Sequence, residues 1–220
     1  GKASIREAYA KFKKAFGKRD PLIRQLIWRD FYYHLGYGFI DRFGDSLKEQ
    51  YDNIKWDNNR TLFNKWKEGR TGYPVIDACM TQINKTGYMH NRGRLLVSSF
   101  LIKNLGIDWR WGEKYFAQSL VDYDVLVNNG NWQWTSGSGA DSQPYFRVFN
   151  PWIQSDRYDK NCEYIKHWLP NLKNVESKHL HQWDKFHTEY NLKDIDYVKP
   201  IVDYKESKAN SLKMYKKYLK

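Results

Sequence analysis

Two arginines and two aspartates stand where a chain could bind an anionic or polyhydroxylated ligand. Arg92 and Arg94, in the segment HNRGR, begin an expected helix, whose free backbone N–H groups and dipole favour anions. Asp122 and Asp124, in VDYDV, end another expected helix, where the dipole favours cations instead. These carboxylates therefore need a partner, such as an arginine or a ligand hydroxyl, unless they only form a loop. The arginines can equally be two solvated side chains.

The segment NNGNWQW, residues 128–134, sets turn-forming residues beside two large apolar rings. Asparagine and glycine are unfavourable in a buried helix, and tryptophan is unfavourable in an exposed loop. The pattern predicts a loop that positions Trp132 and Trp134. Any single tryptophan is more often a packing residue, which leaves a structural interpretation open for Trp28, Trp56, Trp66, Trp109, Trp111, Trp132 and Trp134.

Hydrolytic chemistry by side chains alone is not indicated. The sequence contains no phosphate-binding glycine loop and no convincing Ser-His-Asp or Cys-His set. The HLH segment at 179–181 is too sparse for a metal site, and His90 is interpreted as a structural, hydrogen-bonded residue. The two cysteines, Cys79 and Cys162, fit neither a disulfide framework nor a zinc site, which favours a reducing, intracellular setting. Demanding chemistry would need a cofactor.

The composition favours an anionic partner. The 220 residues carry a formal net charge of +12, and 17% of them are aromatic, including 10 Trp and 17 Tyr. Such a chain suits a nucleic acid or an acidic membrane surface. No apolar run approaches the roughly 20 residues that span a bilayer, which weakens the membrane alternative.

The elements that must position these residues are helical throughout. Apolar residues recur with helical spacing, and Asp20-Pro21, Pro74 and Gly87 mark helix ends. Strand alternation and internal repeats are not found, so the sequence predicts one all-α domain over residues 1–220, with long loops. Segment 20–35 is apolar on much of its circumference and is expected to be central. The expected helices cover 3–16, 20–35, 59–67, 71–87, 90–106, 111–122, 158–169 and 203–219.

Four segments together resemble the FAD-binding catalytic domain of DNA photolyases and cryptochromes. They read WKEGRTGYPVIDACM, TGYMHNRGRLLVSSFLIKNLGIDWRWGEKYF, LVDYDVLVNNGNWQW and PYFRVFNPWIQSDRYD, and the resemblance runs in register from about residue 3 to residue 215. It implies an all-α domain that holds a U-shaped FAD in a central cavity and binds DNA on a basic face.

The resemblance also implies roles for individual residues. Asp122, Tyr123 and Asp124 match the segment that contacts the flavin and ribose, and Arg94 matches the arginine that pairs with Asp122. Asn128 matches the residue that faces N5 of the flavin. Trp132, Trp109 and Trp56 match the chain that transfers electrons to the flavin. Trp28 and Trp134 match the rings that hold a flipped pyrimidine dimer, and Gln25 and Asn91 would hydrogen-bond it. Arg92 and Arg147 are the implied phosphate contacts.

Three departures from the family pattern qualify this resemblance. The Thr/Ser-rich turn that grips the flavin phosphates, and the N-terminal antenna domain, would lie upstream of Gly1. Gln25 stands where repair enzymes for cyclobutane dimers usually have Glu, and Gln is typical of (6-4) photolyases and animal-type cryptochromes. Asn91 and Leu95 stand where the (6-4) type needs histidines, while Asn128 differs from the Asp of plant cryptochromes.

The implied function is light-driven splitting of cyclobutane pyrimidine dimers in double-stranded DNA, with reduced FAD as cofactor. The antenna chromophore is expected to bind elsewhere, and a separate N-terminal half is an expected partner. An intracellular, DNA-containing compartment follows, without a metal or a membrane partner. Two alternatives stay open: a cryptochrome-like blue-light photoreceptor without repair activity, and a DNA-binding remnant that no longer holds FAD.

Overall fold

The computed structural model describes residues 3–218 and contains helices but no strand within that range, which confirms the all-α prediction. None of the helices in this range combines the length and the apolar character that crossing a bilayer requires. The α-helices of the first half are α1 (Ile5–Phe16), α2 (Pro21–Gly38), α3 (Arg60–Glu68), α4 (Pro74–Thr86), α5 (Asn91–Ser99) and α6 (Trp109–Ser119). Those of the second half are α7 (Val125–Ser136), α8 (Pro151–Tyr158), α9 (Glu163–Trp168), α10 (Ser177–Leu180), α11 (Trp183–Phe186) and α12 (Tyr204–Tyr218).

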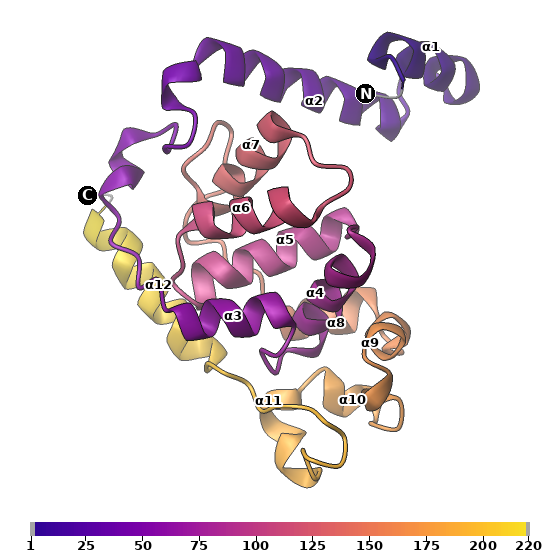
Figure 1. Ribbon diagram of the computed structural model, residues 1–220, viewed down its shortest axis with the longest axis vertical. Coiled ribbons are helices and arrows are strands. Elements are labelled where there is room, and N and C mark those ends of the chain that lie inside the picture. Colours follow the sequence, from indigo (N-terminus) through magenta and orange to yellow (C-terminus); the bar gives the residue numbers. More distant parts are fainter. Residues whose placement is uncertain (1–2, 219–220) are drawn as a thin grey trace.

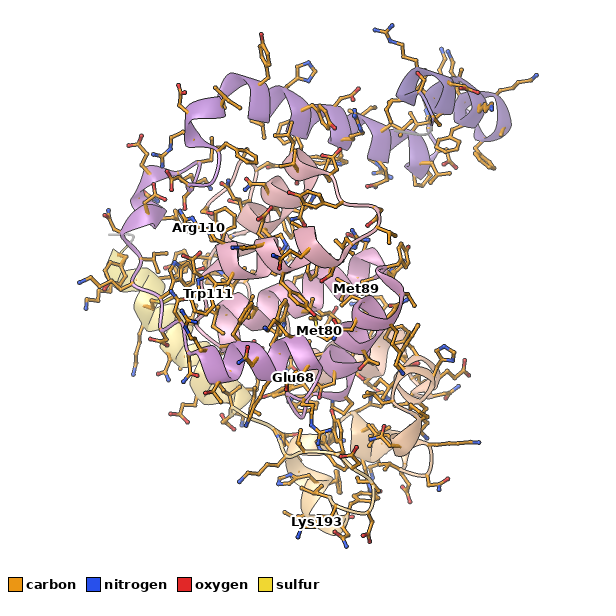
Figure 2. All side chains as sticks on the ribbon, viewed as in Figure 1. Glu68, Met80, Met89, Arg110, Trp111 and Lys193 are labelled. Carbon is orange, nitrogen blue, oxygen red and sulfur yellow. The ribbon has the colours of Figure 1, made fainter. Side chains whose placement is uncertain are left out.

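The core forms around α4, α5 and the π-helical turn η3 (Phe100–Asn104), which continues α5. Met80, fully buried on α4, lies in the middle of the bundle (Figure 2). Helices α3, α6, α7 and α9 pack around this centre, and α12 runs along one side of it (Figure 1). Short 3-10 turns complete the connections: η1 (Ile40–Arg42), η2 (Glu49–Asn53), η4 (Pro170–Leu172) and η5 (His187–Glu189).

Helices α1 and α2 do not form part of this core. Figure 1 shows α2 lying across one end of the bundle and α1 projecting beyond it. The expectation that segment 20–35 is central is therefore wrong, since only Ile23 and Tyr32 of α2 are buried. Helix α2 packs against α7 through one face. Apolar residues on the rest of its circumference, such as Leu22, Ile27 and Tyr37, are exposed.

The segment 128–134 is helical, so the predicted loop is wrong. Asp124 caps the helix, and the polar side chains find partners within it: Asn131 donates to the carbonyl of Val127, and Gln133 donates to Asn129. Gly130 lies where α7 meets α2, and a Cβ at this position would overlap the ring of Tyr32. Local propensity for turns is overridden here by capping and by close packing.

Other helix limits differ more modestly from expectation. The segment 90–106 is an α-helix that becomes π-helical at Phe100, and 111–122 ends at Ser119, so Asp122 and Asp124 lie in the connection to α7. The helix expected over 158–169 is shorter, since only Glu163–Trp168 forms α9, and α8, which ends at Tyr158, was not predicted. The limits of α3 and α4 agree with prediction, and the final residue of the expected 203–219 helix lies outside the described residues.

A buried carboxylate attaches the C-terminal segment to the core. Asp77 of α4 accepts from the backbone N–H groups of Thr71 and Gly72, and from the hydroxyls of Thr71 and Tyr197. Burial raises the pKa of Asp77, and these hydrogen bonds oppose that rise. The four donors compensate for the loss of water around the carboxylate.

The contact between α6 and α7 depends on Gly112, because a Cβ there would overlap the ring of Trp132. We expect Gly112→Ala to lower the free energy of unfolding by about 1–3 kcal/mol through overpacking, measured by urea denaturation. Gly38→Ala is the control, since its Cβ would meet no atom within 4 Å. That variant should be unchanged or more stable by up to about 1 kcal/mol. Equal stability of the two variants would show that α6 and α7 can separate without cost.

Candidate functional site

A cavity of about 540 Å³ opens between α2, α5 and α7, and the connection from Leu120 to Asp124 closes one side of it. Its volume falls in the range of roughly 300–1,000 Å³ that is typical of small-molecule and cofactor sites. Apolar side chains form its floor, notably Phe116, Leu120 and Val127. The carboxylates, amides and indole rings singled out in the sequence line the remaining wall.

Each of the three helices presents one stripe of side chains to the cavity. The stripe on α2 begins at Gln25 and recurs three, four and seven residues later, which is the spacing of one helix face. The stripe on α5 begins at Asn91 with the same spacing. The lining residues from these helices are Gln25, Trp28, Arg29, Tyr32, Asn91, Arg94, Leu95 and Ser98 from α2 and α5, and Val127, Asn128, Asn131, Trp132, Trp134 and Thr135 from α7.

The α2 wall is aromatic. Trp28 keeps 38% of its surface exposed, and its ring meets Phe31 edge to face with centroids 5.3 Å apart. Tyr32 is buried beneath it, and this burial raises the pKa of the Tyr32 hydroxyl to about 12. The Trp28 ring therefore lines the cavity and packs on the neighbouring rings of Phe31 and Tyr32.

Arg94 and Asp122 form the ion pair that the family resemblance implies. Arg94 Nη2 lies 3.0 Å and 2.8 Å from the two carboxylate oxygens of Asp122, and Arg94 Nε donates to the carbonyl of Met89 at 2.7 Å. The pair is partly exposed, with 27% and 47% of the side chains accessible, so its direct contribution to stability is about 0–1 kcal/mol. Its main effect is to orient the Asp122 carboxylate at the cavity edge.

Asp124 connects two of the cavity helices. Its Oδ1 accepts from the backbone N–H groups of Leu126 and Val127, and its Oδ2 accepts from the hydroxyl of Tyr33 at 2.7 Å. The hydrogen bond to Asp124 raises the pKa of Tyr33. Arg29 lies over the Tyr33 ring, 3.9 Å from its centroid. The sequence did not single out Tyr33, although it lies eight residues after Gln25.

The amide of Asn128 is held by Glu113 of α6. Asn128 Nδ2 donates to the Glu113 carbonyl at 3.2 Å and to its Oε1 at 3.0 Å. A carbonyl only accepts, which fixes the orientation of the amide. Both of these hydrogen bonds use Nδ2, so Oδ1 is the atom available to accept from a donor in the cavity. Glu113 was not predicted from the sequence, because its spacing from Asn128 carries no recognisable signal.

The cavity contains only some of the tryptophans named in the sequence. Trp132 is buried against Phe116 and Trp66, with centroids 5.0 Å and 6.4 Å away. Trp109, also buried, and Trp56, which is half-buried against Tyr215, lie outside the cavity lining. Trp132 thus lies between the cavity and the core.

The two implied phosphate-binding arginines also lie outside the lining. Arg92 packs over the ring of Tyr158, 4.5 Å from its centroid, and Arg147 is exposed in the loop before α8. His90 accepts from the backbone N–H of Arg92 and caps α5, which confirms the structural interpretation of this histidine. Within residues 3–218, no group of three or more His, Cys, Asp or Glu side chains is arranged so that it could bind a metal ion.

Comparison with known proteins agrees with this geometry. Residues 22–217 match the family model described as the FAD binding domain of DNA photolyase. A deoxyribodipyrimidine photo-lyase of Buchnera aphidicola (subsp. Acyrthosiphon pisum) is 49% identical over 199 residues, covering 90% of this chain and 41% of the relative. The chain therefore belongs to the family of photolyase FAD-binding domains, and it spans about two fifths of such relatives.

Solved structures show the same fold. An archaeal photolyase from Sulfolobus tokodaii, solved with two FAD molecules, superposes with a TM-score of 0.90 at 45% identity, covering 99% of this chain and 48% of that one. The cryptochrome of Synechocystis sp. PCC6803 superposes with a TM-score of 0.86 at 37% identity, covering 96% of this chain and 46% of that one. Photolyases and cryptochromes thus share this helical domain.

The half-buried Glu113 gives the site a pH dependence. Burial raises its pKa, and the hydrogen bond from Asn128 partly opposes the rise. A carboxyl with a raised folded-state pKa contributes stability below its ordinary pKa, and this contribution is lost as pH rises through the raised value. We expect Glu113→Gln to gain stability relative to the parent protein as pH rises from about 4 to 7.

Urea midpoints measured across this pH range test the expectation. Glu68→Gln, which changes an exposed acid at the end of α3, is the matched control. The gain in midpoint of Glu113→Gln over the parent between pH 4 and 7 should exceed any gain of this control. Parallel curves for Glu113→Gln and the parent would contradict a raised pKa at Glu113.

Proposed function

We propose that this chain is the FAD- and DNA-binding part of an enzyme that splits cyclobutane pyrimidine dimers in double-stranded DNA under light. One observation carries the proposal: a single cavity is lined both by the residues matched to the flavin and by those matched to the lesion. Asp122, Tyr123 and Asn128 lie on its wall together with Trp28 and Trp134. Cofactor and substrate would therefore be in direct contact.

The side chains present fit a flavin. The apolar floor suits a flat ring system, and Asn128 Oδ1 is available for a ring N–H because Glu113 already binds Nδ2. Asp122, held by Arg94, can accept from ribose hydroxyls, and Tyr123 and Asp124 border the same edge. Reduced FAD supplies the photoexcited electron for dimer cleavage. The residues of this chain supply position and electrostatics.

A dimer would be held by rings and amides. Enzymes that act on a base within duplex DNA, photolyases among them, must flip it out of the stack and into a pocket, because its reacting bonds are out of reach in the helix. Trp28 and Trp134 offer the aromatic faces, each worth about 1–3 kcal/mol per stacked base. Gln25 and Asn91 lie on the same wall and can hydrogen-bond the base edges.

The remaining assignments concern electron transfer to the flavin, phosphate contacts with DNA, and the partners of this chain. Trp132, Trp109 and Trp56 would carry electrons from the surface to the cavity, since Trp132 lines it and Trp56 is partly exposed. Arg92 and Arg147 would contact phosphates, which gives affinity that weakens with salt but little sequence preference. We place the antenna chromophore outside residues 1–220, with a separate N-terminal half as partner, in an intracellular compartment that contains DNA.

A second candidate is a blue-light photoreceptor without repair activity. Gln25 favours it, because an amide at this place on the cavity wall can donate a hydrogen bond but cannot move a proton to the lesion. The similarity to a cryptochrome structure is consistent with this alternative. The presence of both Trp28 and Trp134 on the cavity wall favours repair instead.

The first test adds FAD to the purified protein, removes unbound cofactor and records the visible spectrum. A dimer-containing oligonucleotide is then illuminated with blue light in the presence of the reduced holoprotein. We expect retained flavin and recovery of thymine absorbance. Retention without recovery would replace the enzyme by the photoreceptor, and failure to retain flavin would show that this chain holds only part of the cofactor site.

A second test separates electron supply from repair. We expect Trp132→Phe to reduce the rate of flavin photoreduction at least about tenfold, because an indole gives up an electron far more easily than a benzene ring, while repair by pre-reduced protein continues. Trp66→Phe is the matched control, since this buried ring lies 6.4 Å from Trp132 but outside the proposed path. Transient absorption measures the photoreduction. Equal rates in the two variants would exclude Trp132 as the first donor.

A further inference from the structure

A second cavity lies on another side of the bundle. Its volume is about 690 Å³, and it is formed mainly by the stretch 55–57, the turn η3, the segment 201–203 and α12 as far as Met214. None of its lining residues lines the cavity between α2, α5 and α7. Figure 1 shows α12 running along the flank of the bundle, beside the chain that leads into α3. We call this second cavity the α12 groove.

The α12 groove contains a buried acceptor without a partner. Asn104 is 6% exposed, and its Nδ2 donates to Ser207 Oγ at 2.9 Å. Ser207 gives its only hydroxyl proton to the carbonyl of Tyr204, so it can only accept from Asn104. This chain of donors fixes the orientation of the amide. Asn104 Oδ1 is therefore the atom left unsatisfied within the described residues.

A second unpartnered polar atom lies nearby. Ser211 follows Ser207 by one helical turn on α12, is 6% exposed, and its Oγ has no hydrogen-bond partner in the described part of the chain. A buried polar atom left unpaired destabilises the fold, because it has lost its hydrogen bonds to water without replacement. Two such atoms, one on η3 and one on α12, both from residues that line the groove, indicate that it receives a ligand with N–H or O–H donors.

The charge of the groove specifies the ligand further. Three acids line the groove: Asp57, Asp203 and Glu206. The lining has one exposed lysine, Lys55, so acids outnumber exposed lysines there although the whole chain carries a net charge of +12. Lys103 also borders the groove, but its Nζ donates into the core, to the carbonyls of Ser136 and Tyr145. The groove therefore favours cations and disfavours phosphate or carboxylate groups.

The remaining wall is apolar. Besides the acids, five aliphatic or thioether side chains line the groove: Leu62, Leu105, Ile201, Val202 and Met214. A bare metal ion would gain nothing from such a wall, and residues 3–218 bring no three His, Cys, Asp or Glu side chains into a coordinating arrangement. An alkyl chain with ammonium ends matches both surfaces, as lysine side chains do at protein surfaces.

We propose that the α12 groove binds a small aliphatic diamine or polyamine. Its methylene chain lies along the apolar wall, and one ammonium group donates to Asn104 Oδ1 and Ser211 Oγ. The other ammonium group pairs with the carboxylates of Asp57 and Glu206. Charge-assisted hydrogen bonds of this kind are the stronger class and define the specificity for amines.

Isothermal titration calorimetry with putrescine, a four-carbon diamine, at constant ionic strength tests this proposal. We expect one saturable site. Glu206→Gln should weaken binding about tenfold, because one charge-assisted pair is lost, and Ser211→Ala about threefold to tenfold. Asp203 is left intact, since it accepts from the backbone N–H of Glu206 and caps α12. Glu68→Gln on α3, at a residue that does not line the groove, is the matched control and should bind like the parent protein.

Butanediol, which has the same length and hydroxyl donors but no charge, separates an amine site from a general polyol site. It should bind at least about tenfold more weakly than putrescine. Equal affinity for the two would overturn the proposal, as would the absence of saturable heat at millimolar putrescine. Unchanged binding in both Glu206→Gln and Ser211→Ala would place the amine elsewhere and also overturn it.

Discussion

The carboxylate of Asp124 is the interaction on which the candidate site depends. One oxygen accepts from the backbone N–H groups at the start of α7, and the other accepts from Tyr33 on α2. The cap sets the residue at which α7 begins, and so decides which side chains face inward one and two turns later. Asn128 and Trp132 follow Asp124 by four and eight residues, on the same face of the helix. A single carboxylate thus defines the rotation of α7 and ties it to α2.

The close approach of α2 and α7 is the second requirement. Gly130 gives room for the ring of Tyr32, and Gly36 gives room for the side chain of Leu126. Glycine lowers the helix propensity at both positions by about 1 kcal/mol relative to alanine. The packing it permits brings the α2 stripe, with Gln25 and Trp28, against the α7 stripe. The cavity therefore depends on two positions where side chains are absent.

The sequence predicted the fold class, the limits of α3 and α4, and the pairing of Arg94 with Asp122. The fold class and the helix limits rest on signals within a few residues, whereas the pairing of Arg94 with Asp122 was implied only by the resemblance to the photolyase and cryptochrome family. The helical state of 128–134 was not predictable from local propensity, because Asp124, Tyr32 and Gln133 supply the compensation through capping, packing and side-chain pairing. Glu113 and Tyr33 were missed because their partners lie 15 and 91 residues away in the chain. Tyr32, by contrast, could have been predicted as a cavity residue, because it lies on the helix face that begins at Gln25.

Helix α7 is also fixed at its far end. The carbonyl of Ser136 accepts from Lys103 Nζ of η3 and from the hydroxyl of Tyr215 of α12, both at 2.9 Å. Lys103 also lies 3.8 Å from the centroid of the Tyr215 ring, and burial lowers its pKa well below the ordinary lysine value. A helix held at both termini has little freedom to rotate or slide. The position of Asn128 and Trp132 is thus set jointly by α2 at one end and by η3 and α12 at the other, so the C-terminal helix contributes to the geometry of a cavity that it does not touch.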